Sequence, residues 1–85
     1  MIKFDPEPER PVWIQVMEII RGRIQDGTYP PRAKIPSLTR IAQEFEVGLN
    51  TARHVVDDLA EQGLVRPVRS MGTFVVPVED RPSPS

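Results

Sequence analysis

His54, Asp57 and Asp58 are the residues whose types and spacing come nearest to catalytic or metal-binding chemistry. An imidazole three and four residues before two carboxylates could form a proton-transfer pair or begin a metal site. On a helix, however, residues at these spacings are neighbours, and such a pair is typical of an ordinary surface interaction. A stable zinc site needs three or four ligands, whereas the chain has one His and no Cys. We therefore expect no catalytic residue, no metal and no cofactor, and predict that the chain is not an enzyme.

Asn50, Thr51 and Arg53 suggest a different chemistry, because amide, hydroxyl and guanidinium groups can bind base edges or phosphates. They stand early in a stretch whose apolar residues recur at helical spacing, and which Gly63 can end in a left-handed conformation: Ala52, Val55, Val56 and Leu59. Asn50 and Thr51 also suit the first turn of a helix, where they bond to the backbone. An exposed Arg is common on any helix surface. Periodicity alone leaves both interpretations open.

A shorter helical pattern of about two turns comes just before, with apolar residues again three and four apart: Leu38, Ile41, Ala42 and Phe45. Ser37 is suited to cap this helix. Lys34 and Arg40 flank the N-terminus, whose free amide groups attract phosphate. We expect Ser37 to be structural first and phosphate-binding second.

The helix that should support these two carries an apolar stripe over about four turns, from Pro11 to "DGTYPP": Val12, Val16, Ile19, Ile20 and Ile24. "KIPS" is expected to be extended because Ile35 precedes a proline. At the other end, "LVRPV" and "TFVV" are joined by "RSMG", which predicts a hairpin with Gly72 at positive φ. Arg66 and Arg69 on this hairpin could contact the DNA backbone or remain solvated charges of an edge strand.

The order helix, turn, helix, turn, helix, hairpin predicts a mainly α fold with a small β-hairpin, a winged helix-turn-helix. In that arrangement the second of two adjacent helices enters the major groove of DNA. We expect one domain at residues 10–77. Residues 1–9 and 78–85 are Pro-rich and polar, and are expected to be flexible tails.

The composition limits the other classes of function. The chain has 85 residues, 39% of them hydrophobic, which allows one modest core and no membrane segment. The N-terminus lacks the basic start and apolar run of a signal peptide, so we expect a cytoplasmic protein. A net charge of −1 weighs against strong non-specific binding of polyanions. Any basic surface must therefore be local.

Residues from about Pro11 to Pro77 resemble the DNA-binding domain of the GntR-type bacterial transcription regulators. The matching phrases are "PVWIQVMEIIRGRIQDGTYPP", "KIPS", "IAQEFEV", "NTARHVVDDLAEQGLV" and "GTFVV", which are specific only together. The resemblance implies operator binding by the start of the second helix, the first turns of the third and the wing. It implies contacts by Thr51 and Arg53, which match the family's "TVR", and by Gly72 and Thr73, which match its "GTF".

Several positions depart from this pattern. The family usually has "PSER" where this chain has "PSLT", so Thr39 replaces a phosphate-contacting Arg and Arg40 replaces a capping Glu. Leu49 stands where the recognition helix usually opens with Arg, and Gly48 replaces its Ser or Thr cap. In the wing, "SM" replaces a common Gly and a common basic residue. Several cationic contacts to DNA are therefore missing.

These features predict a sequence-specific double-stranded DNA-binding transcriptional regulator, a repressor that acts by occupying a promoter. The residues expected to lie at the DNA are Lys34, Ser37, Thr39, Arg40, Leu49, Asn50, Thr51, Arg53, His54, Arg69, Gly72 and Thr73. The alternative is a winged helix for protein interaction with weak or no DNA binding. It is favoured by the acidic balance, by the missing basic residues, and by Asp57 and Asp58 on the presumed reading face.

We also expect a homodimer, because one domain of this size covers little DNA. The contact would be made by the first helix, through Trp13 or Met17, or by the N-terminal segment. Family members usually continue into a larger ligand-binding and dimerising domain, whereas a Pro-Ser tail follows the hairpin here. No small-molecule effector site and no membrane contact are predicted.

Overall fold

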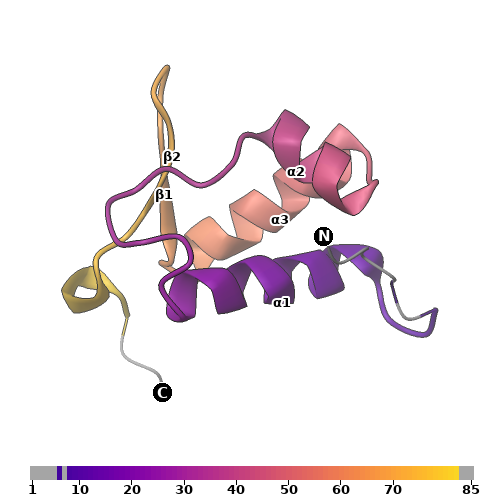
Figure 1. The fold of residues 1–85 in the computed structure, drawn as a ribbon, viewed down its shortest axis with the longest axis horizontal. Coiled ribbons are helices and arrows are strands. Elements are labelled where there is room, and N and C mark those ends of the chain that lie inside the picture. The colour runs from indigo at the N-terminus through magenta and orange to yellow at the C-terminus, as the bar shows by residue number, and fades with distance from the viewer. Residues whose placement is uncertain (1–5, 7, 83–85) are drawn as a thin grey trace.

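The computed structural model describes residues 6 and 8–82. Its elements are α1 (Val12–Gln25), α2 (Leu38–Phe45), α3 (Leu49–Glu61), β1 (Val65–Val68), β2 (Gly72–Val75) and a 3-10 turn, η1 (Val78–Asp80). The two strands form an antiparallel hairpin after three helices, as Figure 1 shows. The predicted winged helix-turn-helix is therefore confirmed. No helix among the described residues is long and apolar enough to cross a membrane.

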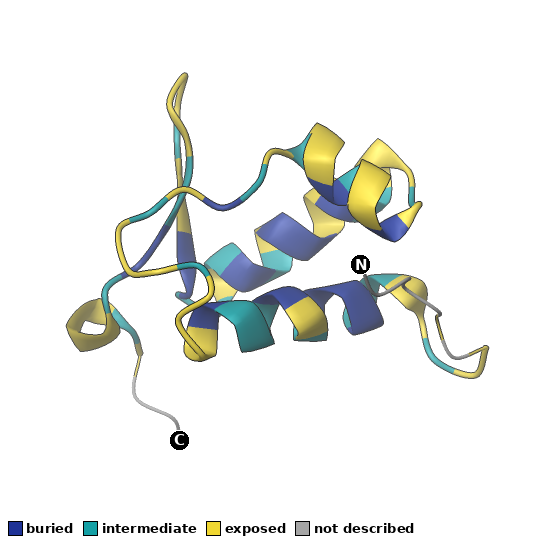
Figure 2. Ribbon diagram, in the orientation of Figure 1, coloured by how far each residue is buried: buried dark blue, intermediate teal, exposed yellow. Residues whose placement is uncertain are grey.

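The core lies where α3 packs against both α1 and α2, and Figure 2 shows the buried faces of these helices turned toward one another. The predicted stripes of α2 and α3 are confirmed at Ile41 and Phe45, and at all four predicted positions of α3. Leu38 and Ala42 are half-buried against the same core. Spacings of three and four residues therefore identified the inner faces of these two helices.

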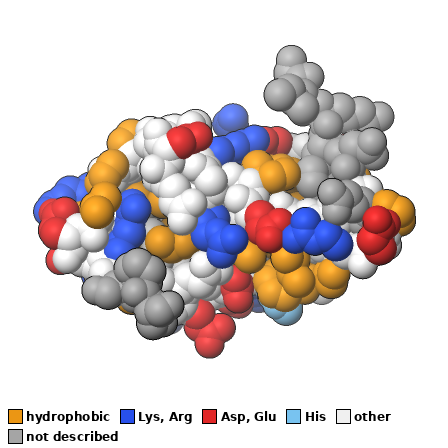
Figure 3. All heavy atoms as spheres, turned by 90° about the horizontal axis from the view of Figure 1, so that it is seen from below, with side chains coloured by type: hydrophobic (Ala, Val, Ile, Leu, Met, Phe, Trp, Pro, Cys, Tyr) orange, Lys and Arg blue, Asp and Glu red, His pale blue; other side chains and the backbone are white. Residues whose placement is uncertain are grey.

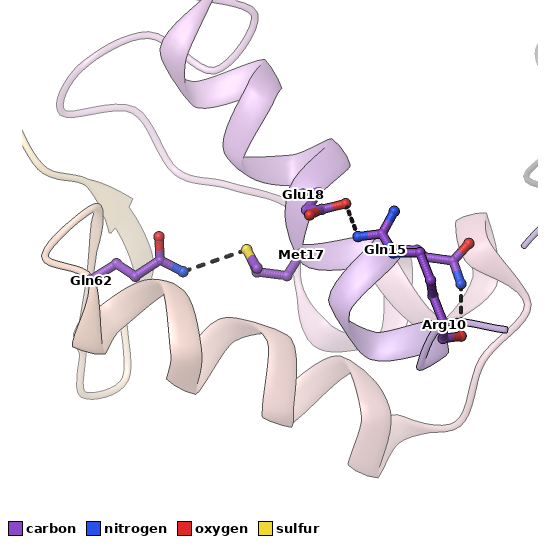
Figure 4. Close-up of polar contacts among 5 residues, drawn as sticks. All are labelled: Arg10, Gln15, Met17, Glu18 and Gln62. Atoms are coloured by element: carbon purple, nitrogen blue, oxygen red, sulfur yellow. Dashed lines mark hydrogen bonds and ion pairs between the residues drawn. The ribbon is translucent and has the colours of Figure 1, made fainter. Parts of the chain in front are cut away.

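The inner face of α1 is rotated from the one predicted. Val16, Ile20 and Ile24 are buried, but Val12 and Ile19 are each 37% exposed. Met17, expected beside the stripe, is only 7% exposed. Met17 faces the end of α3, where the Gln62 side-chain amide donates to its sulfur at 3.4 Å (Figure 4). Apolar residues surround much of α1, so periodicity alone could not select the side that α3 covers.

Polar contacts hold both ends of α1. At its beginning, Arg10 lies just before the helix and is bound by two residues of α1. The buried Gln15 side chain donates to the Arg10 carbonyl oxygen at 2.9 Å, and the Arg10 side chain pairs with Glu18 at 2.6 Å (Figure 4). In its last turn, Arg23 donates to the Tyr29 hydroxyl and pairs with Glu44 of α2. The bond to Glu44 is the main reason that the pKa of the Arg23 guanidinium lies above its ordinary value. Arg23 therefore remains charged and ties α1 to α2.

The turn between α2 and α3 is built from local backbone bonds. Ser37 caps α2, because the Arg40 N–H donates to its hydroxyl oxygen at 3.3 Å. Glu46 ends α2 with φ +55°, in the left-handed region. At the far end of α3, Gly63 has φ +77° and its N–H donates to the Ala60 carbonyl, while Leu64 donates to Leu59. This is a Schellman motif, and it confirms the predicted role of Gly63.

β2 lies between β1 and the extended segment before α2. In the hairpin, Val65 pairs with Val75 and Val68 pairs with Gly72. On the other side of β2, Ile35 donates to the Thr73 carbonyl at 2.9 Å. The extended conformation of "KIPS" is confirmed, whereas its pairing with the wing was not anticipated.

The hairpin tip is a tight turn in which Met71 donates to the Val68 carbonyl at 3.0 Å. Ser70 has φ +67°, and Arg69 is not among the residues with positive φ, which is the pattern of a type II turn. Gly72 follows with φ +116°, as the sequence predicted. A Ser therefore occupies a position that usually favours Gly.

The chain continues as regular structure for a few residues beyond the predicted domain limit at residue 77. Val78–Asp80 form η1, and the Arg81 side chain donates to the Val76 carbonyl at 2.9 Å. A Cβ atom at Gly63 would lie only 2.4 Å from the Pro82 side chain, so this proline covers the end of α3. Residues 78–82 of the expected tail therefore contain a 3-10 turn and contacts to the domain. The rest of both expected tails, residues 1–5, 7 and 83–85, lies outside the described residues.

Candidate nucleic-acid interface

The side of the molecule opposite α1 carries the N-terminus of α2 and the tip of the hairpin. In the view of Figure 1, α1 runs along the bottom, α3 crosses the middle, and α2 and the hairpin tip lie at the top. This arrangement offers two protruding elements on either side of the exposed face of α3. A groove-binding surface would lie between them.

The reading surface of α3, which we define as Leu49, Asn50 and Arg53, lies at the beginning of the helix. All three side chains are exposed, and Leu49 is 55% exposed. Arg53 follows Asn50 by three residues and Leu49 by four, so the three share one side of the helix. Asp57 extends the same row by another four residues and is also exposed. The surface thus combines an apolar, an amide and a cationic group beside one carboxylate.

Thr51 and His54, which were also predicted to lie at the DNA, differ in where α3 places them. Thr51 is half-buried in a hollow that it shares with Val12 of α1 and Phe45 of α2. The His54 ring lies 4.1 Å from the Trp13 ring of α1, between centroids, with the planes tilted by 34°. His54 is nevertheless exposed and lines one hollow with Asn50 and Arg53, so the structure brings it beside the reading surface, whereas Thr51 lies apart from it.

The carboxylates near His54 do not form a catalytic or metal-binding group. Asp58 accepts a hydrogen bond from the Gln62 side chain at 2.7 Å, on the side of α3 that meets α1. It is half-buried and lines one hollow with Asn50, Arg53 and Asp57, so both aspartates lie beside the reading surface. Within residues 6 and 8–82, no group of three or more His, Asp or Glu could hold a metal ion.

The N-terminus of α2 presents Ser37, Thr39 and Arg40, all of them exposed. The Ser37 hydroxyl accepts the Arg40 N–H, which leaves its own proton free to be donated outward. Arg40 lines a shallow hollow with Gln43 and Glu44. The first amide groups of the helix and the Arg40 guanidinium can both attract an anion here.

Lys34 joins the wing rather than standing only at the start of α2. Its backbone forms an antiparallel bridge with Phe74 of β2, and Arg66 of β1 pairs with Phe74 on the other side of that strand. A Cβ atom at Gly72 would lie 3.0 Å from Cε of Lys34, so the lysine side chain crosses the wing at this glycine. The sequence did not reveal this contact, because it depends on pairing between segments far apart in the chain.

The tip and strands of the wing hold the remaining predicted contacts. Arg69 is exposed in the turn, Met71 is 59% exposed, and Thr73 is half-buried in β2. Together with Lys34 and Arg66, the wing therefore offers cationic groups around a mainly uncharged tip. The wing is therefore a local basic surface, as expected for a DNA-binding chain whose net charge is close to zero.

Comparisons with known proteins agree with this geometry. Residues 14–75 match the family described as "Bacterial regulatory proteins, gntR family". The chain is 39% identical over 64 residues to an uncharacterised helix-turn-helix-type transcriptional regulator of Rhizobium meliloti, covering 75% of this chain and 26% of that protein. It is 31% identical over 65 residues to the transcriptional repressor NagR of Bacillus subtilis, covering 76% of this chain and 27% of that protein.

Among solved structures, AraR(DBD) in complex with an operator superimposes with a TM-score of 0.80 at 32% identity, covering 89% of this chain and all of that one. A GntR family transcriptional regulator from Listeria monocytogenes has a TM-score of 0.79 at 25% identity, covering 84% of this chain and 62% of that one. The chain spans about a quarter of the length of the curated relatives named above. The family consists of regulatory proteins, which agrees with the prediction that the chain is not an enzyme.

Proposed function

The chain belongs to the gntR family of bacterial regulatory proteins, and from that membership we propose that it binds double-stranded operator DNA in a sequence-specific manner and regulates transcription. The observation that carries the proposal is the exposed polar and cationic beginning of α3, between the capped N-terminus of α2 and the wing. AraR(DBD), which shares this fold, is in complex with an operator in its solved structure.

In the proposed complex, α3 enters the major groove and its first turns reach the base edges. Asn50 is suited to the donor and acceptor pair of an adenine, and Arg53 to guanine or a phosphate. Ser37, Thr39 and Arg40 would contact the backbone at the start of α2, and Lys34, Arg69, Gly72 and Thr73 would do so at the wing. Thr51 and His54 remain candidates for contacts at the edge of this surface.

We further propose repression by promoter occupancy in the bacterial cytoplasm. Two relatives support this direction, since one is the repressor NagR and another is an arabinose metabolism transcriptional repressor of Geobacillus stearothermophilus, 31% identical over 78 residues. Occupying a promoter requires only that the domain bind its site, and it requires no small-molecule site within this domain.

The alternative is a winged helix that binds another protein. The exposed Asp57 beside Arg53 and the net charge of −1 favour it, because both weaken attraction to phosphate. The two functions differ in what the chain selects. A protein-binding module would enrich no particular duplex from a random pool, whereas a DNA reader would enrich one.

The test is a selection from random double-stranded DNA at low salt, followed by fluorescence anisotropy of the enriched duplex at two salt concentrations. We expect one enriched motif and modest affinity that falls steeply with salt, because binding releases counterions from the phosphates. Failure to enrich a motif, or affinity that does not change with salt, would contradict the proposal.

We also propose that two copies associate through α1. Met17 lies in the core and does not suit the contact expected of it, whereas Trp13 is half-buried against His54. Val12 and Ile19 are the exposed apolar residues of α1. Figure 3, which views the molecule from the α1 side, shows exposed apolar side chains between charges of both signs.

A further inference from the structure

Leu49 is an apolar residue in an exposed position that folding does not require. It is 55% exposed, whereas the other apolar residues of α2 and α3 are buried or packed against the core. It could have folded back to cover the start of α3, but this exposure shows that it does not. An apolar side chain in water contributes hydrophobic free energy only when another surface covers it.

The position of Leu49 identifies the surface that covers it. It is the first residue of α3, beside Asn50 and one turn before Arg53, within the reading surface. In helix-turn-helix proteins, the N-terminal residues of this helix contact base edges in the major groove. A side chain at this position therefore meets the floor of the groove when the domain binds DNA.

The chemistry of Leu49 limits what it can recognise there. Its side chain neither donates nor accepts a hydrogen bond, so it gains nothing from the polar groups of guanine, adenine or cytosine. The C5-methyl group of thymine is the apolar group that a base edge presents in the major groove. Covering that methyl group removes apolar surface of both partners from water.

We propose that Leu49 packs on the C5-methyl group of one thymine and so specifies thymine at one position of the recognised site. The inference rests on the proposed DNA-binding function and deepens it by naming a base and the residue that reads it. Asn50 and Arg53 would then read neighbouring positions through hydrogen bonds, and Leu49 would discriminate by shape and apolar contact alone.

The test uses the duplex that the chain enriches from a random pool. Each thymine in turn is replaced by uracil, which removes only the C5-methyl group and keeps base pairing. We expect one thymine position, or one in each half-site, at which the replacement weakens binding about fourfold, the effect of burying one such carbon group. At the other thymines we expect no comparable loss.

Leu49→Ala supplies the second half of the test. Binding to the thymine duplex should weaken, and replacing the sensitive thymine by uracil should then have no further effect. The melting temperature should be unchanged, because the residue is exposed and Ala is a good helix former. Met71→Ala removes an exposed apolar side chain at the wing tip and is the matched control, which should leave the uracil effect intact.

The outcomes separate the inference from the function on which it rests. Enrichment of no duplex overturns the proposed function. An enriched duplex without a uracil-sensitive thymine overturns the role of Leu49 and leaves DNA binding standing. A uracil effect that persists in Leu49→Ala, or that disappears in Met71→Ala, also overturns the assignment to Leu49.

Discussion

Asp57 places a carboxylate on the same side of α3 as Arg53, four residues further along the helix. A negative charge close to DNA phosphates opposes binding, and at such an exposed position its effect is modest and screened by salt. We predict that Asp57→Asn tightens binding to the enriched duplex about twofold to fivefold at low salt, which corresponds to a gain in binding free energy of at most about 1 kcal/mol.

The matched control is Asp80→Asn, which removes the same charge from η1, where the side chain is also exposed. Fluorescence anisotropy at two salt concentrations should show the gain for Asp57→Asn shrinking as salt rises, and little change for the control. Equal effects of the two variants would mean that only net charge matters and that the row from Leu49 to Asp57 does not face DNA.

Leu49→Arg tests the same surface by adding a cation. For a duplex selected with the variant, in which Arg need not face the thymine proposed above, we predict tighter binding by roughly 1 to 3 kcal/mol at most, because Arg can make a charge-assisted contact that Leu cannot. Stability should be unchanged, since the leucine is 55% exposed. Thermal melting and anisotropy are measured together. Unchanged stability with no gain in affinity would count against DNA reading, and loss of a protein partner instead would favour the interaction module.

At the scale of elements, Gly63 and Gly22 test how the C-terminal end of α3 is stabilised, because one is tightly surrounded and the other is not. Gly63 has φ +77°, and a Cβ atom there would lie 2.4 Å from Cδ of Pro82. Gly22 lies inside α1, with nothing within 4 Å of its would-be Cβ. We predict that Gly63→Ala lowers the free energy of unfolding by about 1 to 2 kcal/mol, because an L-residue is strained in the left-handed region.

Gly22→Ala is the paired variant and should raise the free energy of unfolding by about 0.5 to 1 kcal/mol, because Ala loses less entropy in a helix. Urea unfolding followed by circular dichroism measures both. If Gly63→Ala were neutral, the Schellman turn and the packing of Pro82 on α3 would not be as described.

The elements that depend on residues close together in the sequence were the easiest to predict. α2 and α3 follow from apolar spacing, a serine cap and a glycine end, all readable within a dozen residues. α1 was predicted as a helix, but its buried side was misjudged because Val12 and Ile19 look as suitable for a core as Val16 and Ile20. The pairing of Lys34 with Phe74 joins segments far apart in the sequence, so no local pattern could predict it.

The candidate site was predicted in its chemistry more than in its geometry. The polar beginning of α3 indicated recognition, but sequence order alone could not separate Asn50 and Arg53 from Thr51. That separation depends on how α1 and α2 pack around the start of α3, which leaves Thr51 half-buried in a hollow with Val12 and Phe45. The contact of Pro82 with Gly63 could not be predicted for a similar reason, since it joins residues far apart in the chain.

At the scale of the whole molecule, the proposed association through α1 can be tested with one exposed residue. Ile19→Glu places a charge where Ile19 is 37% exposed, so the fold should remain intact while the contact is lost. We predict that sedimentation velocity at high concentration shows a dimer for the unaltered chain and a monomer for this variant. Val78→Glu, at an exposed apolar residue of η1, should remain dimeric. A monomeric unaltered chain would rule out the contact.

α3 is the element proposed to read DNA, and Arg53→Ala tests this role most directly. Arg53 is exposed and outside the core, so its removal should leave the melting temperature unchanged. Anisotropy with the enriched duplex should show a loss of about tenfold or more, as expected for a charged contact to a base or phosphate, and a shallower dependence on salt. A folded Arg53→Ala variant that binds the duplex as tightly as the unaltered chain, with the same salt dependence, would contradict the proposed interface.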